Sequence, residues 1–208
     1  MDSATRVDVN DTAHLTLETG FVSRIDSDPG TTVTITGGTL GQLGEVLSSV
    51  VRGYFEMSGG LVRGPGLHVS GEMIMSGGSI ETPFTGDSTS SILMTGGSFQ
   101  NSGSTVFNGS LDIFGGFFGS SSRQLTVGAT GTVEVFGSLF TLDGIPITPG
   151  MVTALSGVLA GVYESGSAFS WRFTRNPTGT LSLIPEPGTA WLLGAGLAGL
   201  ALRRRSLR

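Results

Sequence analysis

Three acidic residues, Glu56, Asp112 and Glu134, stand at the same position of a short segment that recurs along the chain. Paired carboxylates are the groups with which glycosidases carry out acid, base and nucleophilic steps, so these residues are the first candidates for chemistry. Ile74 and Leu93 fill the two equivalent positions between Glu56 and Asp112 and interrupt the acidic row. We therefore interpret the acids as part of a solvated strand surface and predict that the protein is not an enzyme.

The other reactive residue types do not form a recognisable metal or cofactor site. The chain has no Cys, and its two histidines, His14 and His68, lack the spacing of metal ligands. Met57, Met75 and Met94 recur at one position, but Ile and Val share that position, so we expect the methionines in the core. We predict neither a metal site nor a cofactor.

The charge distribution argues against a nucleic-acid partner. Only 13% of the residues are charged, the net charge is −5, and every cation is an arginine. Four of the 11 arginines lie in the last six positions, so the rest of the chain is more acidic than the total. A surface that binds phosphate backbones must be basic, which this one is not.

A repeated segment that ends in a glycine pair covers the first two thirds of the chain. The second glycine recurs at steps of 18, 22, 18, 19, 19 and 22 residues, beginning at Gly20 and ending at Ser138, which replaces it in the last copy. The clear copies are Thr32–Gly38, Tyr54–Gly60, Glu72–Gly78, Ser91–Gly97, Ser110–Gly116 and Thr132–Ser138.

Apolar residues alternate with more polar ones in each copy, which predicts strands with one buried face. The glycine pair is expected to turn the chain, because glycine tolerates left-handed backbone, and an apolar residue follows it. The resulting columns are Leu15, Val33, Phe55, Met73, Ile92, Leu111 and Val133; Leu17, Ile35, Met57, Met75, Met94, Ile113 and Val135; and Val22, Leu40, Val62, Ile80, Phe99, Phe118 and Phe140.

Strands that recur every 18 to 22 residues predict stacked coils that pair with one another at a spacing of about 4.8 Å. We predict an all-β fold, a right-handed parallel β-helix (β-solenoid) over residues 1–144. A β-sandwich or barrel is the competing interpretation, because its strands also recur at short intervals.

Residues 145–184 depart from the repeat and are expected to cap the last coil. We predict a hairpin with strands near Val152–Tyr163 and at Ala168–Thr174, joined by a turn that contains Gly and Ser. Such a hairpin would cover the open edge of the solenoid, which would otherwise invite aggregation. One face of its second strand would carry Phe169, Trp171 and Phe173.

The final segment, 185–208, has three parts in a fixed order: the tripeptide Pro185-Glu186-Pro187, an apolar run over 189–202, and the cluster Arg203, Arg204 and Arg205. This order closely resembles the PEP-CTERM sorting signal of bacteria that export proteins alongside exopolysaccharide. The resemblance implies that exosortase, a membrane protease-transpeptidase, reads Pro185, Glu186 and Pro187 and processes the tail.

The apolar run is expected to be a short transmembrane anchor. As a helix, residues 189–202 would be about 21 Å long, against a hydrocarbon core of about 30 Å. The arginines after it should hold the C-terminus in the cytoplasm and leave the solenoid outside. The residues expected in the bilayer include Trp191, Leu192, Leu193, Leu197, Leu200 and Leu202.

The N-terminal sequence MDSATRVDVNDT lacks the apolar stretch of a signal peptide, although exported proteins of this kind carry one. We expect the gene to begin further upstream.

Taken together, these patterns predict an exported structural or adhesive protein of the cell surface or extracellular matrix. Its expected partners are exosortase and, transiently, the inner membrane, with exopolysaccharide as a further candidate. The alternative is a carbohydrate-binding or lyase- or hydrolase-like β-helix protein, because Asp112 and Glu134 would lie on adjacent coils.

Overall fold

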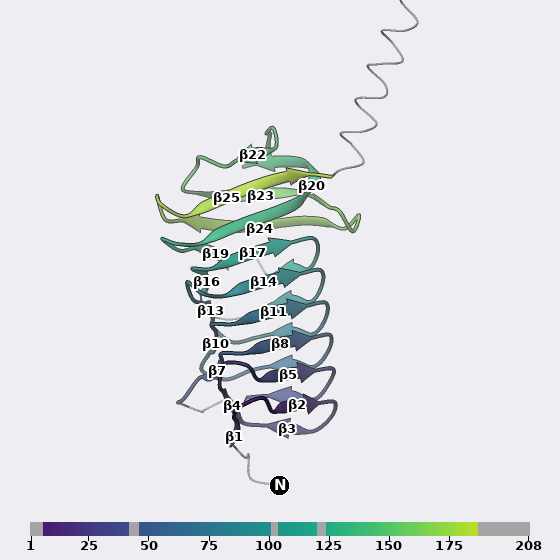
Figure 1. Ribbon diagram of the computed structural model, residues 1–208. Coiled ribbons are helices and arrows are strands. Elements are labelled where there is room, and N and C mark those ends of the chain that lie inside the picture. The colour runs from purple at the N-terminus through teal and green to yellow at the C-terminus, as the bar shows by residue number, and fades with distance from the viewer. Residues whose placement is uncertain (1–5, 42–45, 101–103, 120–123, 187–208) are drawn as a thin grey trace, which may run out of the picture.

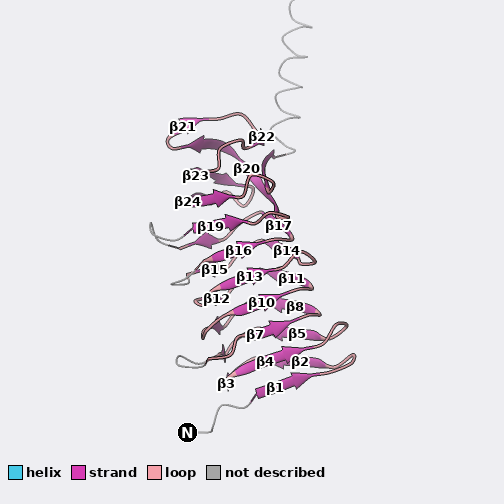
Figure 2. Ribbon diagram, turned by 90° about the vertical axis from the view of Figure 1, so that its left-hand side faces the viewer, coloured by secondary structure: helices cyan, strands magenta, loops and turns pink. Residues whose placement is uncertain are grey.

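The chain forms a right-handed β-solenoid of about six turns that ends in a β-rich cap, as the computed structural model shows (Figures 1 and 2). The structure describes residues 6–41, 46–100, 104–119 and 124–186. Within these residues every regular element is a strand. The predicted fold class is therefore confirmed, and the competing sandwich or barrel is not what the chain adopts.

The solenoid has three faces, each built from one strand per coil. Face 1 consists of β2 (His14–Leu17), β5 (Thr32–Ile35), β8 (Tyr54–Met57), β11 (Glu72–Met75), β14 (Ser91–Met94), β17 (Ser110–Ile113) and the start of β20 (Thr132–Leu142). Face 2 consists of β1 (Arg6–Val9), β4 (Arg24–Ser27), β7 (Ser49–Val51), β10 (Leu67–Val69), β13 (Phe84–Gly86), β16 (Thr105–Phe107) and β19 (Gln124–Val127). The short face 3 consists of β3 (Phe21–Val22), β6 (Thr39–Leu40), β9 (Leu61–Val62), β12 (Ser79–Ile80), β15 (Ser98–Phe99) and β18 (Phe117–Phe118).

Successive coils pair in parallel and in the register that the repeat predicts. On face 1, Val33 pairs with Leu15 below it and with Phe55 above it, and the series continues to Val133. The same holds on face 3 from Val22 to Phe118. The unequal repeat lengths are therefore absorbed between the strands and leave the pairing intact.

The three predicted columns form the interior. All their members from the second coil onwards are buried, while Leu15 and Val22 of the first coil are half-buried. Aromatic rings add contacts inside: the ring centroid of Phe84 lies 5.1 Å from that of Phe99 and 5.3 Å from that of Phe107. Burial of one such large side chain contributes roughly 1.5–3 kcal/mol to the free energy of folding. A coil buries its inner side chains against the coils above and below, so its stability depends on these neighbours.

The turn from face 1 to face 3 requires glycine. The second glycine of every pair has a positive φ, for example +80° at Gly97. A Cβ built on Gly97 would lie 2.6 Å from Cε of Met75 and 2.8 Å from the carbonyl oxygen of Gly77 in the coil below. Both the backbone conformation and the stacking of coils therefore exclude a side chain here.

The placement of Phe140 in the third column was wrong. In the last copy Ser138 replaces the turn-forming glycine, and β20 continues straight through Ser138 to Leu142 instead of turning onto face 3. Its extended half pairs antiparallel with β23 (Ser156–Tyr163), with a bulge between Ser138 and Thr141. Phe140 is still buried, but it packs within the cap.

The predicted capping hairpin is confirmed. β23 and β24 (Ala168–Arg175) pair antiparallel over most of their length, and the three aromatic residues of β24 point into the core. Nε1 of Trp171 donates a hydrogen bond of 3.1 Å to the buried hydroxyl of Tyr163, whose pKa is raised by burial. β24 also pairs in parallel with β19, so the hairpin continues face 2.

Two short strands, β21 (Ile145–Pro146) and β22 (Gly150–Met151), lie in the cap above these layers (Figure 2). The last strand, β25 (Thr180–Pro185), pairs in parallel with β20 and continues face 1. Among the residues that the structure describes, no helix is long and apolar enough to cross a membrane. The expected anchor over 189–202 lies outside those residues.

The role of the glycine turns can be tested at Gly97. We expect Gly97→Ala to lower the free energy of unfolding by about 2–4 kcal/mol, because left-handed strain and a clash with the coil below add together. Gly144 is a matched control, since it has φ of +79° but no atom within 4 Å of an added Cβ. Gly144→Ala should cost only about 1 kcal/mol. Urea unfolding measures both, and equal losses would contradict the stacking argument.

Candidate functional site

The strand that leads into the tripeptide Pro185-Glu186-Pro187 is part of the folded solenoid. The side chains of Leu181 and Leu183 in β25 are buried, and these residues pair with Val133 and Val135 of β20. The two leucines therefore extend the two inner columns of face 1 by one more coil. Pro185, the first residue of the tripeptide, is the last residue of β25 and pairs with Gly137.

Two hydrogen bonds hold Glu186 against β20. Its backbone N–H donates to the carbonyl oxygen of Gly137 at 3.3 Å, and Ser138 Oγ donates to Oε1 of Glu186 at 3.4 Å. Pro185 itself is exposed and Glu186 is half-buried. The start of the tripeptide is thus fixed in position while part of it stays accessible to a partner.

The other edge of β25 is covered in its first half. Gly150 and Met151 of β22 pair antiparallel with Leu183 and Ser182, and the N–H of Val152 donates to the carbonyl oxygen of Leu181 at 2.8 Å. β25 is therefore an interior strand up to Leu183, which anchors it more firmly than a single edge pairing would.

The remaining predicted residues of the tail lie outside the described part of the chain, and their roles stay predictions. They are Pro187, Trp191, Leu192, Leu193, Leu197, Leu200, Leu202, Arg203, Arg204 and Arg205.

Comparison with known families identifies this segment. A family model described as the PEP-CTERM protein-sorting motif matches residues 183–205. Comparisons with curated proteins and with solved structures found no match to the chain. The protein is therefore a β-solenoid that carries a PEP-CTERM sorting motif. The motif indicates a precursor that is exported across a membrane and recognised by exosortase, a membrane protease.

The candidate acids lie where the repeat places them, on the outer surface of face 1. Asp112 pairs with Glu134 on the next coil, whereas Glu56 is separated from them by Ile74 and Leu93. All three acids are half-buried, and partial burial raises the pKa of Asp112 above its usual range.

Two aromatic residues beside these acids were missed by the sequence analysis. The rings of Phe114 and Phe136 stack with centroids 4.0 Å apart and planes 9° from parallel. Each directly follows a buried residue of the second column, Ile113 or Val135, so both point outward, and both are half-buried. The signal was present as the repeated Ile-Phe and Val-Phe steps at 113–114 and 135–136. Together with Asp112 and Glu134 they form a strip, which we call the Phe–acid strip.

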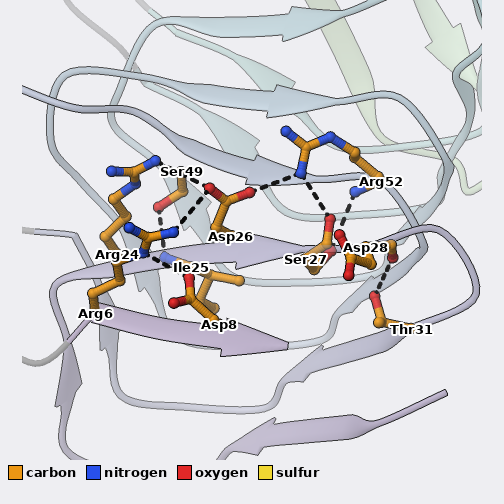
Figure 3. Close-up of polar contacts among 10 residues, drawn as sticks. All are labelled: Arg6, Asp8, Arg24, Ile25, Asp26, Ser27, Asp28, Thr31, Ser49 and Arg52. Atoms are coloured by element: carbon orange, nitrogen blue, oxygen red, sulfur yellow. Dashed lines mark hydrogen bonds and ion pairs between the residues drawn. The ribbon is translucent and has the colours of Figure 1, made fainter. Parts of the chain in front are cut away.

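A second polar group lies on face 2 of the first coils (Figure 3). Asp26 accepts hydrogen bonds from Arg52 at 2.7 Å and from Arg24 at 3.2 Å, and Arg6 lies 3.5 Å away. Arg6 also pairs with Asp8 at 2.6 Å. These contacts join β1, β4 and Arg52, the residue that follows β7, so we interpret the group as ion pairs that stabilise the stacking of the first coils. Its signal in the sequence was the 18-residue step between Arg6-Val7-Asp8 and Arg24-Ile25-Asp26.

The histidines are not brought together. His14 lies on face 1 and His68 on face 2, and both are exposed. No group of three or more His, Cys, Asp or Glu residues that could hold a metal ion occurs in the described part of the chain. An open depression of about 450 Å³ in the cap, which Gln124, Asp143 and Arg172 help to line, is polar and shallow rather than an enclosed ligand cavity.

The state of Asp112 predicts a pH dependence of stability. Because burial raises the pKa of Asp112, the folded protein binds the carboxyl proton of Asp112 more tightly than the unfolded chain does. Ionisation of Asp112 therefore lowers the free energy of unfolding. The loss begins as the pH rises above the pKa of an unfolded Asp, about 3.9, and is complete above the higher pKa of the folded state. Asp112→Asn removes this cost, so the variant should gain stability relative to the wild type between pH 3 and pH 7. Urea unfolding at both pH values tests this, and an unchanged or opposite difference would contradict it.

Proposed function

We propose that this protein is a non-catalytic structural or adhesive component of the cell surface or extracellular matrix, delivered there through its C-terminal sorting motif. The rigid solenoid is the cargo, and the tail directs its sorting and processing. Exosortase acts on the precursor while the tail holds it in the inner membrane.

The observation that carries the proposal is the pairing of Pro185 with Gly137. The tripeptide begins at the last residue of β25, so no linker separates the cargo from the signal. Cleavage after the tripeptide would leave every coil and the whole cap intact. The released product would be a stiff rod whose outer faces are available for contacts with the matrix.

Two further features support a structural rather than a catalytic role. The acidic row on face 1 is interrupted by Ile74 and Leu93, so only Asp112 and Glu134 are neighbours. The ion pairs around Asp26 serve to join strands of the first coils. The described surface thus offers many regular polar positions but few groups arranged for a reaction.

A carbohydrate-binding role is the second candidate, and the Phe–acid strip favours it. Aromatic rings contact the apolar faces of sugars, and carboxylates accept hydrogen bonds from sugar hydroxyls. Phe114, Phe136, Asp112 and Glu134 offer both groups on adjacent coils. This function differs from the first in requiring saturable binding of a soluble oligosaccharide.

The sorting role is tested by the mature C-terminus in the native host. The full-length gene with its upstream region is expressed as wild type and as Pro185→Ala/Glu186→Ala/Pro187→Ala, and the C-termini are determined by mass spectrometry. We expect the wild type to lose the hydrophobic run 189–202 and the variant to keep it, because exosortase no longer recognises the motif.

The matched control is Ser138→Ala, which removes the hydrogen bond to Glu186 but leaves the motif unchanged. Its C-terminus should be the same as that of the wild type. An intact tail in the wild-type protein would refute the processing step and leave the tail as a simple anchor.

A further inference from the structure

The end of the cap exposes a group of apolar side chains. Leu139 is 79% exposed, Ile145 68% and Met151 67%, which is unusual for large aliphatic residues in one short region. Residues Leu139, Pro146, Ile147 and Pro149, with Phe140 and Thr141, also line a hollow of about 330 Å³. We call the group Leu139, Ile145, Pro146, Ile147, Pro149 and Met151 the apolar apex.

The apex carries little charge. Asp143 is the one ionisable residue between positions 139 and 155. Its Oδ1 already accepts a hydrogen bond of 2.8 Å from the N–H of Val158, so it helps to fix the turn between β20 and β21. A surface of this composition suits an apolar or interfacial environment better than open water.

Leu139 is held in a costly backbone conformation. Its φ of +53° is left-handed, which is rare for a bulky non-glycine residue and costs of order 1–2 kcal/mol. The bulge between Ser138 and Thr141 turns the Leu139 side chain outward while Phe140 fills the core. Packing of the cap uses the bulge but does not require a leucine at this position, because the Leu139 side chain is 79% exposed.

The position of the tail determines what this surface meets. Glu186 is hydrogen-bonded to Gly137, which lies two residues before Leu139 on the same strand. The apolar run begins at 189, only three residues beyond Glu186, and three fully extended residues span about 10 Å. If the run enters the bilayer, Glu186 must lie within that distance of the membrane surface, and the part of the cap beside Glu186 is brought close to it.

We propose that the apolar apex is a membrane-docking surface that enters the interface of the inner membrane while the precursor is held by its tail. The proposal rests on the proposed function, because it requires the run 189–202 to be the anchor. Leu139, Ile145 and Met151 would lie at the boundary of headgroups and acyl chains. The docked cap would hold the tripeptide at a defined height above the bilayer, where a membrane protease can reach it.

The test uses the full-length protein in vesicles of phosphatidylethanolamine and phosphatidylglycerol. Because the chain has no cysteine, Ile145→Cys and Ser88→Cys each accept one environment-sensitive fluorophore. Ser88 is the matched control, since it is exposed in the turn between β13 and β14, and two further coils, with β16 and β19, separate β13 from the cap strand β24. We expect the label at position 145 to shift to the blue and to lose iodide quenching, and the label at 88 to do neither.

A second variant adds Leu139→Asn and Met151→Ser to the labelled Ile145→Cys protein. Asn tolerates the left-handed backbone, so the fold should persist. The blue shift and the protection from iodide should then decrease, because Leu139 and Met151 are lost in addition to Ile145, which the labelled cysteine already replaces.

The outcomes separate the two proposals. Protein that does not float with the vesicles would overturn the anchoring role of the tail and the docking with it. Protein that floats, but whose label at 145 is quenched as strongly as that at 88, would overturn the docking alone.

Discussion

Parallel pairing between successive coils determines where each side chain of the solenoid lies. It places each side chain directly over the equivalent residue of the coil below, at a spacing of about 4.8 Å. In the interior, apolar side chains must therefore stack on apolar side chains. Val33 over Leu15 and Phe55 over Val33 are the start of such a column. The same spacing leaves no room for a Cβ at the turns, which is why glycine recurs there.

The last coil of the solenoid is covered by the cap, and the same strands position the sorting motif. β24 and β25 return from the cap to extend faces 2 and 1, and β22 covers part of the last edge. The matched sorting motif, residues 183–205, begins inside β25, and its tripeptide begins at the final paired residue, Pro185. The closing strand of the solenoid and the start of the sorting signal are therefore one element, and the apolar apex lies beside it.

The repeat made most of the solenoid predictable, because the columns and the glycine steps recur often enough to fix the register without any local ambiguity. The prediction from the repeat was wrong at Phe140. There Ser138 replaces the turn-forming glycine, and β20 continues to Leu142 instead of turning onto face 3. β25 was not predicted as a strand. It pairs with a segment 48 positions earlier, with Thr180 opposite Thr132, and this long step occurs once and is not part of the repeat. The Phe–acid strip was only half found, because outward aromatic residues resemble core residues in sequence. The roles of the tail beyond Glu186 rest on sequence alone.

The sorting tripeptide emerges from a hydrogen-bonded strand of the solenoid. Hydrogen–deuterium exchange of the full-length protein measures this pairing, by comparing the backbone amides within Thr180–Glu186 with those of Thr132–Gly137 in β20. We expect slow exchange in both segments, because β25 is paired along β20 and its leucines are buried. Exchange over Thr180–Glu186 as fast as that of an unstructured peptide would show that β25 is not paired.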